Sequence, residues 1–239
     1  MKNILIVTPT YNERENLAAF ADGVFGVLED AHLMIVDDNS PDGTGALADR
    51  IAERDPRVHV MHRPGKLGLG SAYMDAFRWG VEQGYELIFE MDTDLSHDPS
   101  YLPAFVRAFD EGADLVIGSR NISGGGVEGW GPGRHVLSKG GSLYSRAILG
   151  IPIRDLTSGY KAFRREVLST IDLDAVRSEG YSFQIELTYR ALRKGFRVAE
   201  VPIVFVDRRA GQSKMSRRIF AEAVLMVPRL RLMALTGRL

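Results

Sequence analysis

Two acidic residues one position apart, Asp92 and Asp94, directly follow an apolar stretch at 87–91. In extended backbone, positions i and i+2 project to the same side, so both carboxylates can face one point just beyond the strand end. Hard oxygen ligands suit Mg²⁺ or Mn²⁺, which usually completes its coordination shell with water and substrate phosphates. A D-x-D triplet is also common in surface loops. Its position after a buried-looking strand favours a site that stabilises the diphosphate of a nucleotide-sugar as a leaving group.

Short apolar runs alternate with longer amphipathic stretches over the first half of the chain. The predicted strands are 4–8, 33–37, 58–61, 87–91 and 115–118, and the predicted helices are 15–28, 44–54, 69–83 and 101–109. Uninterrupted apolar strands, each followed by a helix, indicate an α/β fold with a mostly parallel sheet flanked by helices. No linker separates two domains, although two small subdomains around a cleft remain an alternative.

The candidate binding residues fall at the ends of the predicted strands. Pro9, Tyr11 and Glu13 follow the first strand, Asp37 and Asp38 the second, Asp92 and Asp94 the fourth, and Arg120 the fifth. Ligands of parallel α/β sheets bind outside the carboxyl ends of the strands. The sequence therefore predicts one site along that edge of the sheet.

The residues after the first two strands offer groups that could hold a nucleotide. Tyr11 can stack on a base, and the Glu13 carboxylate can accept hydrogen bonds from a base or a ribose. We assign Asp38 to the nucleotide and Asp37 to a structural role. Residues 39–44 are interpreted as a turn followed by a helix cap.

Positively charged side chains in loops and at element ends form the other half of the predicted site. They are Arg120, Arg134, Lys139, Arg208 and Lys214. Each alone is an ordinary surface charge. As a set that converges beside a dianionic diphosphate, they would form a clamp.

A glycine-rich segment spans residues 121–133. So many glycines support regular structure poorly, and the segment is predicted to be a mobile loop that closes over substrate. Beyond it, helical patterns resume at 135–149 and 183–194, and residues 201–206 are predicted to form a strand.

The last segment, 216–239, has a helical pattern with two interpretations. Its apolar stripe is Ile219, Ala223, Met226, Leu230 and Met233, and Arg218, Glu222 and Arg229 lie on an adjoining face. The helix either packs on the core or rests as a basic amphipathic helix on an anionic membrane surface. Pro228 is expected to kink or interrupt it.

Composition excludes several classes of protein. The 239 residues carry a net charge of −1, which argues against a protein that binds nucleic acid over its whole surface. The chain has no cysteine, so disulfides and thiolate chemistry are excluded, and a reducing cytoplasm is compatible. We expect neither a signal peptide nor a transmembrane helix, because the apolar runs are too short.

Several short motifs, taken together and in order, resemble those of a known enzyme family. They are 9–13 (PTYNE), 36–42 (VDDNSPD), 91–97 (MDTDLSH), 118–120 (GSR), 157–160 (TSGY), 179–184 (EGYSFQ) and 211–214 (GQSK). The chain resembles family 2 glycosyltransferases from about residue 2 to residue 220. Within that family it is similar to the dolichyl- or polyprenyl-phosphate mannose synthases.

The resemblance implies a nucleotide-diphospho-sugar transferase (GT-A) fold. It also implies transfer of mannose, with inversion, from GDP-mannose to a polyprenyl monophosphate with Mg²⁺ or Mn²⁺. By similarity, the nucleotide-sugar would be bound by Pro9, Tyr11, Glu13, Val36, Asp38, Asp92, Thr93, Asp94, Arg120, Arg208 and Lys214. Asp92 and Asp94 would hold the metal, with Ser96 where some relatives have a glutamine ligand. Arg134, Ser138 and Lys139 would hold the acceptor phosphate, and Asp92, Asp94 and Arg134 would be the catalytic residues.

Residues 1–215 would then form the catalytic domain and 216–239 a C-terminal helical segment. The protein would be peripheral at the cytoplasmic face of a membrane, attached by that helix or by a small membrane-anchoring partner protein. A phosphate monoester is mostly dianionic near neutral pH, so the acceptor needs no strong base.

Three alternatives remain. The first is a glucosyltransferase that uses UDP-glucose and the same lipid, and the second is a non-catalytic nucleotide-sugar-binding subunit. The third, a nucleotidyltransferase, would be expected to have a glycine-rich phosphate loop near the N-terminus. The glycines at 65, 68 and 70 do not form one, because no Gly-Lys-Ser/Thr follows at the required spacing.

Overall fold

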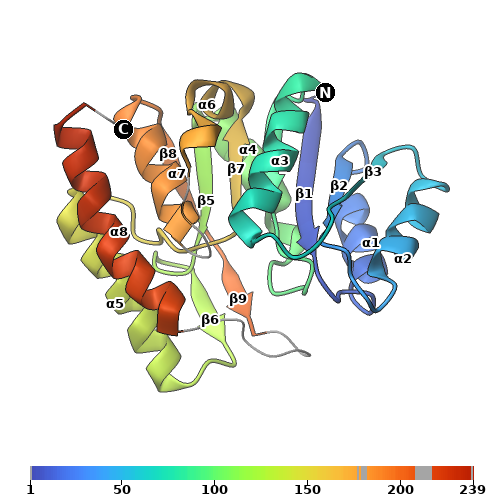
Figure 1. Cartoon of the computed structure of the whole chain (residues 1–239), viewed down its shortest axis with the longest axis horizontal. Coiled ribbons are helices and arrows are strands. Elements are labelled where there is room, and N and C mark those ends of the chain that lie inside the picture. Colours follow the sequence, from blue (N-terminus) through green and yellow to red (C-terminus); the bar gives the residue numbers. More distant parts are fainter. Residues whose placement is uncertain (1, 177, 179–181, 208–216, 238) are drawn as a thin grey trace.

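A computed structural model describes residues 2–176, 178, 182–207, 217–237 and 239, without the side chains of residues 132, 136 and 217–223. Its main sheet has seven strands in the order β3-β2-β1-β4-β7-β5-β8 (Figure 1). These strands are β1 (Ile4–Thr10), β2 (His32–Asp37), β3 (Val58–His62), β4 (Leu87–Glu90), β5 (Leu115–Ser119), β7 (Lys161–Arg164) and β8 (Val198–Pro202). All neighbouring pairs are parallel except those that β7 makes with β4 and β5. The predicted α/β fold with a mostly parallel sheet is confirmed.

Helices cover both faces of the sheet, and each face has its own hydrophobic core. Strand β1 contributes alternate side chains to the two cores. Leu5 and Val7 belong to one hydrophobic cluster, and Ile4 and Ile6 to the other. The first cluster includes side chains of α3 (Leu69–Glu82), α6 (Arg165–Thr170), η2 (Leu173–Ala175), α7 (Ser182–Arg193) and α8 (Arg217–Leu235). The second includes side chains of α1 (Leu17–Val27), α2 (Thr44–Ala52) and α4 (Leu102–Asp110), which follows η1 (Pro99–Tyr101).

Strand β7 was not predicted, and it changes the middle of the sheet. It runs antiparallel between β4 and β5, with Lys161 opposite Glu90 and Phe163 opposite Leu115. Its four residues follow the loop after α5 (Pro132–Leu149), and no long apolar run marks them. The strand exists because both neighbours supply hydrogen-bond partners, a tertiary effect that local propensity does not show.

The predicted strand at 201–206 is in fact two strands, and the glycine-rich segment is not a structureless loop. Residues 201 and 202 end β8, whereas β9 (Val204–Val206) pairs with β6 (Gly126–Glu128) in a separate two-stranded sheet. A Cβ atom on Gly125 would clash with the Ser119 carbonyl oxygen. The glycine there permits close backbone approach, so the interpretation of all of 121–133 as a mobile loop was wrong.

The C-terminal helix α8 passes through Pro228 without interruption, contrary to one of the two expectations. Proline lacks the N–H group that would bond to the carbonyl four residues earlier, which is Val224. Tyr144 Oη of α5 donates to that carbonyl oxygen at 2.7 Å. A side chain of the neighbouring helix therefore satisfies the acceptor that the proline leaves unused.

One face of α8 packs on the core, as the first interpretation of this segment predicted. Val227 and Leu230 are buried, and Met226 is partly buried against the same cluster. The opposite face also carries large apolar side chains, with Leu225 75% and Leu232 62% exposed beside the exposed Arg229. Within the described ranges, no helix combines the length and the apolar character needed to cross a membrane.

The packing of α8 predicts effects of very different size on stability for two leucines of one helix. Leu230→Ala should lower the free energy of unfolding by about 2–5 kcal/mol, because it leaves a cavity in the core. Leu232→Ala, on the exposed face, should change it by no more than about 0.5 kcal/mol. Urea denaturation followed by circular dichroism measures both. Equal effects would mean that α8 is not part of the core.

Candidate active site

The carboxylates of Asp92 and Asp94 lie in a short turn just after β4. Ser96 donates to Asp94 Oδ1 twice, from its backbone N–H at 3.1 Å and from its hydroxyl at 2.5 Å. The Asp92 N–H donates to His97 Nδ1 at 3.1 Å, so Nδ1 is the acceptor in this hydrogen bond and carries no hydrogen. His97 in turn stacks on Tyr160, with ring centroids 5.0 Å apart. Backbone and side chains thus hold both carboxylates at the sheet edge.

This donor set fits a hard divalent cation that shares its coordination with a substrate. Among the residues that the structure describes, no group of three or more His, Cys, Asp or Glu side chains could hold a metal ion. Two carboxylates fit Mg²⁺ or Mn²⁺ when water and diphosphate oxygens provide the other ligands. Ser96, the third predicted ligand, is here a hydrogen-bond donor to Asp94.

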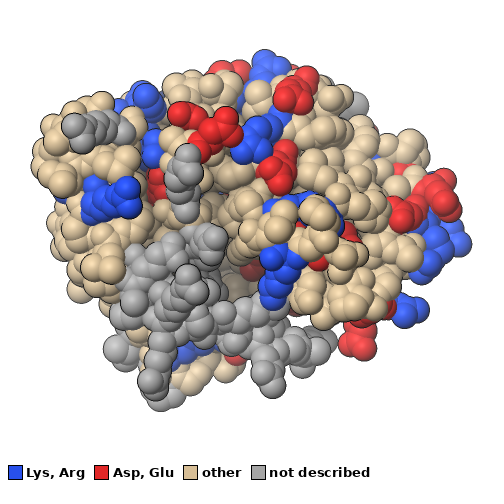
Figure 2. All heavy atoms as spheres, in the orientation of Figure 1, with Lys and Arg blue, Asp and Glu red and all other residues tan. Residues whose placement is uncertain are grey.

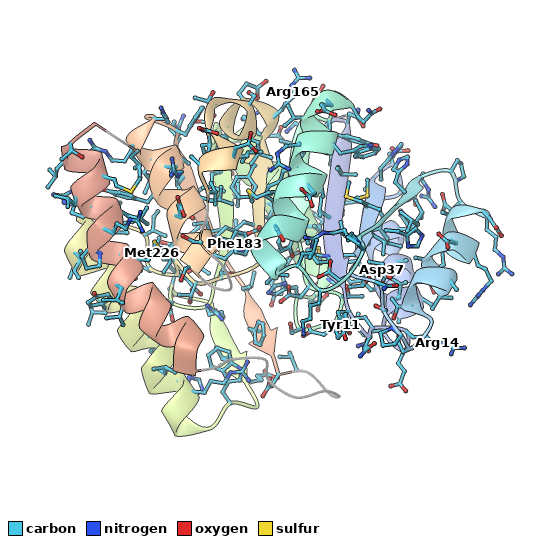
Figure 3. The ribbon with its side chains drawn as sticks, viewed as in Figure 1. Tyr11, Arg14, Asp37, Arg165, Phe183 and Met226 are labelled. Carbon is cyan, nitrogen blue, oxygen red and sulfur yellow. The ribbon has the colours of Figure 1, made fainter. Side chains whose placement is uncertain are left out.

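The ends of β1 and β2 form the part of the edge predicted to bind a nucleotide, where Figure 3 shows Tyr11 and Asp37. Asp37 accepts hydrogen bonds from Thr10 Oγ1 at 3.0 Å and from the Ser40 hydroxyl at 2.6 Å, as expected for a structural acceptor. Thr93 Oγ1 lies 2.6 Å from Thr8 Oγ1, which joins β1 to the turn after β4.

The remaining residues of the predicted nucleotide site lie on the same edge. Pro9 is in β1, and its carbonyl oxygen accepts from Thr93 Oγ1 at 3.3 Å. Glu13 receives a hydrogen bond from Asn16 Nδ2 at 2.9 Å. Val36 is fully buried in β2, so a ligand would meet its backbone and not its side chain.

Asp38 is fixed by an arginine that the sequence analysis missed. Arg63 Nη1 donates to Asp38 Oδ1 at 2.7 Å, and Nη2 donates to Ser71 Oγ at 2.6 Å. Burial raises the pKa of Asp38, and the Arg63 charge offsets part of that rise. Arg63 directly follows β3, so the rule that ligands gather at the carboxyl ends of strands could have found it. Close by, Lys66 Nζ lies 4.5 Å from the centre of the Tyr11 ring.

Two of the predicted cations meet around one aromatic ring. The guanidinium carbons of Arg134 and Arg120 lie 4.2 and 5.5 Å from the centre of the Trp130 ring. Arg134 Nη1 pairs with Asp207 at 2.8 Å. Trp130 was not predicted as part of the site, although it lies inside the glycine-rich segment.

Arg120 is held by a buried carboxylate that was also missed. Its Nε and Nη2 donate to the two oxygens of Asp155, both at 2.7 Å, and Nη2 also donates to Thr157 Oγ1 at 3.0 Å. Burial alone would raise the pKa of Asp155, but the charge and hydrogen bonds of Arg120 outweigh it, and the pKa lies below its usual range.

The last four predicted residues of the acceptor site and clamp have different outcomes. Ser138 follows Arg134 by one helical turn on α5, so the two side chains share a face. Lys139 is exposed beside them. Arg208 and Lys214 lie outside the described residues.

A buried glutamate and a buried lysine also occupy neighbouring strands, next to the turn that carries the two carboxylates. Glu90 and Lys161 are fully buried and face each other across β4 and β7. Burial raises the pKa of Glu90 to about 8 and lowers the pKa of Lys161 to about 8. Lys161 Nζ also donates to the Gln184 carbonyl oxygen at 2.7 Å, which ties α7 to the sheet.

Comparisons with known proteins agree with this architecture. The family model "Glycosyl transferase family 2" matches residues 5–172. The chain is 54% identical over 224 residues to polyprenol monophosphomannose synthase of Mycolicibacterium smegmatis, covering 93% of this chain and 84% of that protein. It is 48% identical over 226 residues to undecaprenyl-phosphate mannosyltransferase of Micrococcus luteus, covering 95% and 93%.

A solved structure also shares the fold. It is the Mycobacterium tuberculosis glucosyl-3-phosphoglycerate synthase in complex with Mn²⁺, UDP-glucose and phosphoglyceric acid. The TM-score is 0.65 at 22% identity, covering 95% of this chain and 80% of that chain. This likeness shows the GT-A fold.

The buried pair of Arg120 and Asp155 predicts a large cost of breaking it. Asp155→Ala should lower the free energy of unfolding by about 3–5 kcal/mol, because it leaves a buried guanidinium without its carboxylate. Asp110→Ala removes an exposed carboxylate paired with Lys2 and should cost at most about 1 kcal/mol. Chemical denaturation at neutral pH compares the two. A cost for Asp155→Ala as small as that of the control would contradict the structural role of the pair.

Proposed function

Because the chain belongs to glycosyl transferase family 2, we propose that this glycosyltransferase moves mannose, with inversion, from GDP-mannose to a polyprenyl monophosphate. The observation that carries the proposal is the paired carboxylates of Asp92 and Asp94 at a sheet edge that also presents Arg120, whose guanidinium shares the Trp130 ring with that of Arg134. The relatives named polyprenol monophosphomannose synthase and undecaprenyl-phosphate mannosyltransferase support both mannose and a polyprenyl acceptor. Residues 1–215 carry this chemistry.

The donor would lie along the carboxyl ends of β1, β2 and β4. Tyr11 would stack on the guanine, and Asp38, held by Arg63, would accept hydrogen bonds from the nucleoside. Pro9, Glu13, Val36 and Thr93 would complete this half of the site. The diphosphate would then reach Asp92 and Asp94, with Arg120, Arg208 and Lys214 as its cationic partners.

Asp92 and Asp94 would hold Mg²⁺ or Mn²⁺, with Ser96 supporting Asp94. The Mn²⁺ complex of the structurally similar glucosyl-3-phosphoglycerate synthase supports a divalent cation. When bound, the cation supplies charge stabilisation to the departing diphosphate.

The acceptor brings its own nucleophile. A phosphate monoester is mostly dianionic at neutral pH, so one of its oxygens can attack the anomeric carbon as the bond to GDP breaks. The main obstacle is repulsion between two phosphate-bearing substrates. Arg134, with Ser138 and Lys139 on the same helix, would offset this repulsion and orient the acceptor.

A lipid acceptor requires the chain to work at a bilayer. We place the protein at the cytoplasmic face of a membrane, held peripherally by its own surface or by a small membrane-anchoring partner protein. GDP-mannose is a water-soluble donor, whereas the polyprenyl tail stays in the lipid.

Donor and acceptor are tested in one assay with purified protein in detergent. GDP-mannose with polyprenyl phosphate and Mg²⁺ or Mn²⁺ should give polyprenyl-phosphate mannose, and UDP-glucose should give at most a minor product. Asp94→Asn should lower kcat by about 10²-fold or more, because it weakens the charge stabilisation of the leaving group. Asp98→Asn, in the same turn but capping η1, is the matched control and should keep near wild-type turnover.

Preferential use of UDP-glucose would contradict the choice of donor. Binding of GDP-mannose without any turnover would indicate a non-catalytic subunit. Equal activity of Asp94→Asn and Asp98→Asn would remove Asp94 from the metal site.

Arg63 is expected to act on nucleotide affinity. Arg63→Met should weaken GDP binding by roughly 10- to 100-fold, because Asp38 loses a charge-assisted hydrogen bond. Arg63 pairs with Asp75 as well as with Asp38. Arg78→Met is the control, because Arg78 pairs with the same Asp75, and the described hydrogen bonds of Asp38 do not include Arg78. Isothermal titration calorimetry with GDP and Mg²⁺ measures both. Equal affinities of the two variants would place the base away from Asp38.

A further inference from the structure

Helix α5 presents an apolar stripe to solvent. The exposed positions along it are Gly133, Leu137, Gly140, Leu143 and Ala147, at helical spacing and without a charge. Leu143 is 64% exposed. On a surface helix the apolar stripe normally faces the core.

Helix α8 runs beside α5 (Figure 1). It exposes a second apolar stripe. Its exposed apolar residues are Val224, Leu225, Pro228, Leu232 and Leu235. Two hydrogen bonds join the helices, from Tyr144 Oη to the Val224 carbonyl and from Arg231 Nη1 to the Leu149 carbonyl. In Figure 2, the described atoms at the end of the molecule formed by α5 and α8 are mostly tan, the colour of residues other than Lys, Arg, Asp and Glu. Exposed apolar stripes on two adjoining helices mark an interaction surface.

The charged side chains of α5 itself are basic, although Arg134 is paired with Asp207. From Gly129 to Arg154 the sequence contains no Asp or Glu, although the whole chain has a net charge of −1. Lys139, Arg146 and Arg154 line a cavity of about 480 Å³, and Leu143 of the apolar stripe lines it as well. Cationic and apolar side chains therefore meet at one place on α5.

The cavity also contains polar atoms suited to an anion. Ser142 Oγ and Arg146 Nε are buried, and neither has a hydrogen-bond partner among the described residues. Both can donate to a phosphate oxygen. Arg120 lines the same cavity, but its guanidinium is already paired with Asp155.

We propose that the exposed faces of α5 and α8 dock on an anionic lipid bilayer and that the cavity beside Leu143 receives the headgroup phosphate of a bilayer phospholipid. This proposal rests on the proposed function, since it explains how the chain reaches an acceptor whose tail stays in the membrane. The leucines enter the boundary between headgroups and acyl chains, and Arg146 and Arg154 contact phosphates at the same depth. The docking stripe of α8 is not the one singled out in the sequence, because Met226 and Leu230 face the core.

A bilayer fits this surface better than a protein partner. A membrane presents acyl chains and a layer of phosphates together, which matches an apolar stripe bordered by Lys139, Arg146 and Arg154. Arg134 lies on α5 as well, so docking this helix brings the proposed acceptor site to the headgroup layer.

The test is flotation of the full chain with vesicles of phosphatidylcholine, with or without phosphatidylglycerol. The wild type should float with the anionic vesicles and much less with the neutral ones. Arg146→Gln/Arg154→Gln should weaken anionic binding roughly 25-fold, about fivefold for each arginine. Arg50→Gln/Arg107→Gln, two exposed positions on α2 and α4, makes the same change in net charge and should have little effect.

A second variant tests the apolar component. Leu143→Gln/Leu225→Gln/Leu232→Gln should lose binding to both kinds of vesicle while its thermal unfolding stays that of the wild type, because these side chains are exposed. Wild-type vesicle binding by either docking variant would overturn the proposal. So would wild-type protein that ignores anionic vesicles and instead forms a dimer that the leucine variant disrupts.

Transfer to a short, water-soluble prenyl phosphate separates this proposal from the proposed function. Both docking variants should retain transfer to the short acceptor and should lose transfer only to the long-chain polyprenyl phosphate in vesicles. Absence of transfer to the short acceptor in the wild type would contradict the proposed function and leave the docking result intact. Equal loss of both activities in the docking variants would overturn the docking surface.

Discussion

Four buried ionisable side chains fix the geometry on which the site depends. Glu90 and Lys161 face each other across β4 and β7, and Asp155 holds Arg120 at the end of β5. Lys161 interacts electrostatically with both carboxyl groups. In a low-dielectric interior, breaking the charged pair of Arg120 and Asp155 leaves an uncompensated charge at a cost of several kcal/mol. The strand that leads to Asp92 and the cation at Arg120 are thereby locked to each other.

The antiparallel strand β7 makes this arrangement possible. It separates two groups of parallel strands and places Lys161 between the strand that carries the acidic pair and the strand that leads to Arg120. Helix α5 then bears Arg134, whose guanidinium packs on Trp130 as that of Arg120 does, and an apolar stripe along its exposed side. One helix thus belongs both to the proposed acceptor site and to the proposed membrane surface.

The sequence predicted the parallel part of the fold because its strands are apolar runs, each followed by an amphipathic helix. The rule that ligands bind at the carboxyl ends of parallel strands also located Tyr11, Asp38 and Asp92 from the sequence alone. It did not locate β7, β6 or β9, because short strands depend on distant partners more than on their own composition. It also missed Arg63 and Asp155, whose importance lies in single contacts with residues far along the chain. In the C-terminal helix, periodicity revealed the apolar stripe that packs on the core. It did not reveal that the exposed face carries leucines as well.

The most direct measurement is a crystal structure of the protein with GDP and Mn²⁺, in which anomalous scattering locates the metal. The expected result is one anomalous peak within coordination distance of Asp94 and the GDP diphosphate, with the guanine beside Asp38. A peak away from Asp92 and Asp94, or a nucleotide bound outside the edge formed by β1, β2 and β4, would contradict the proposed site.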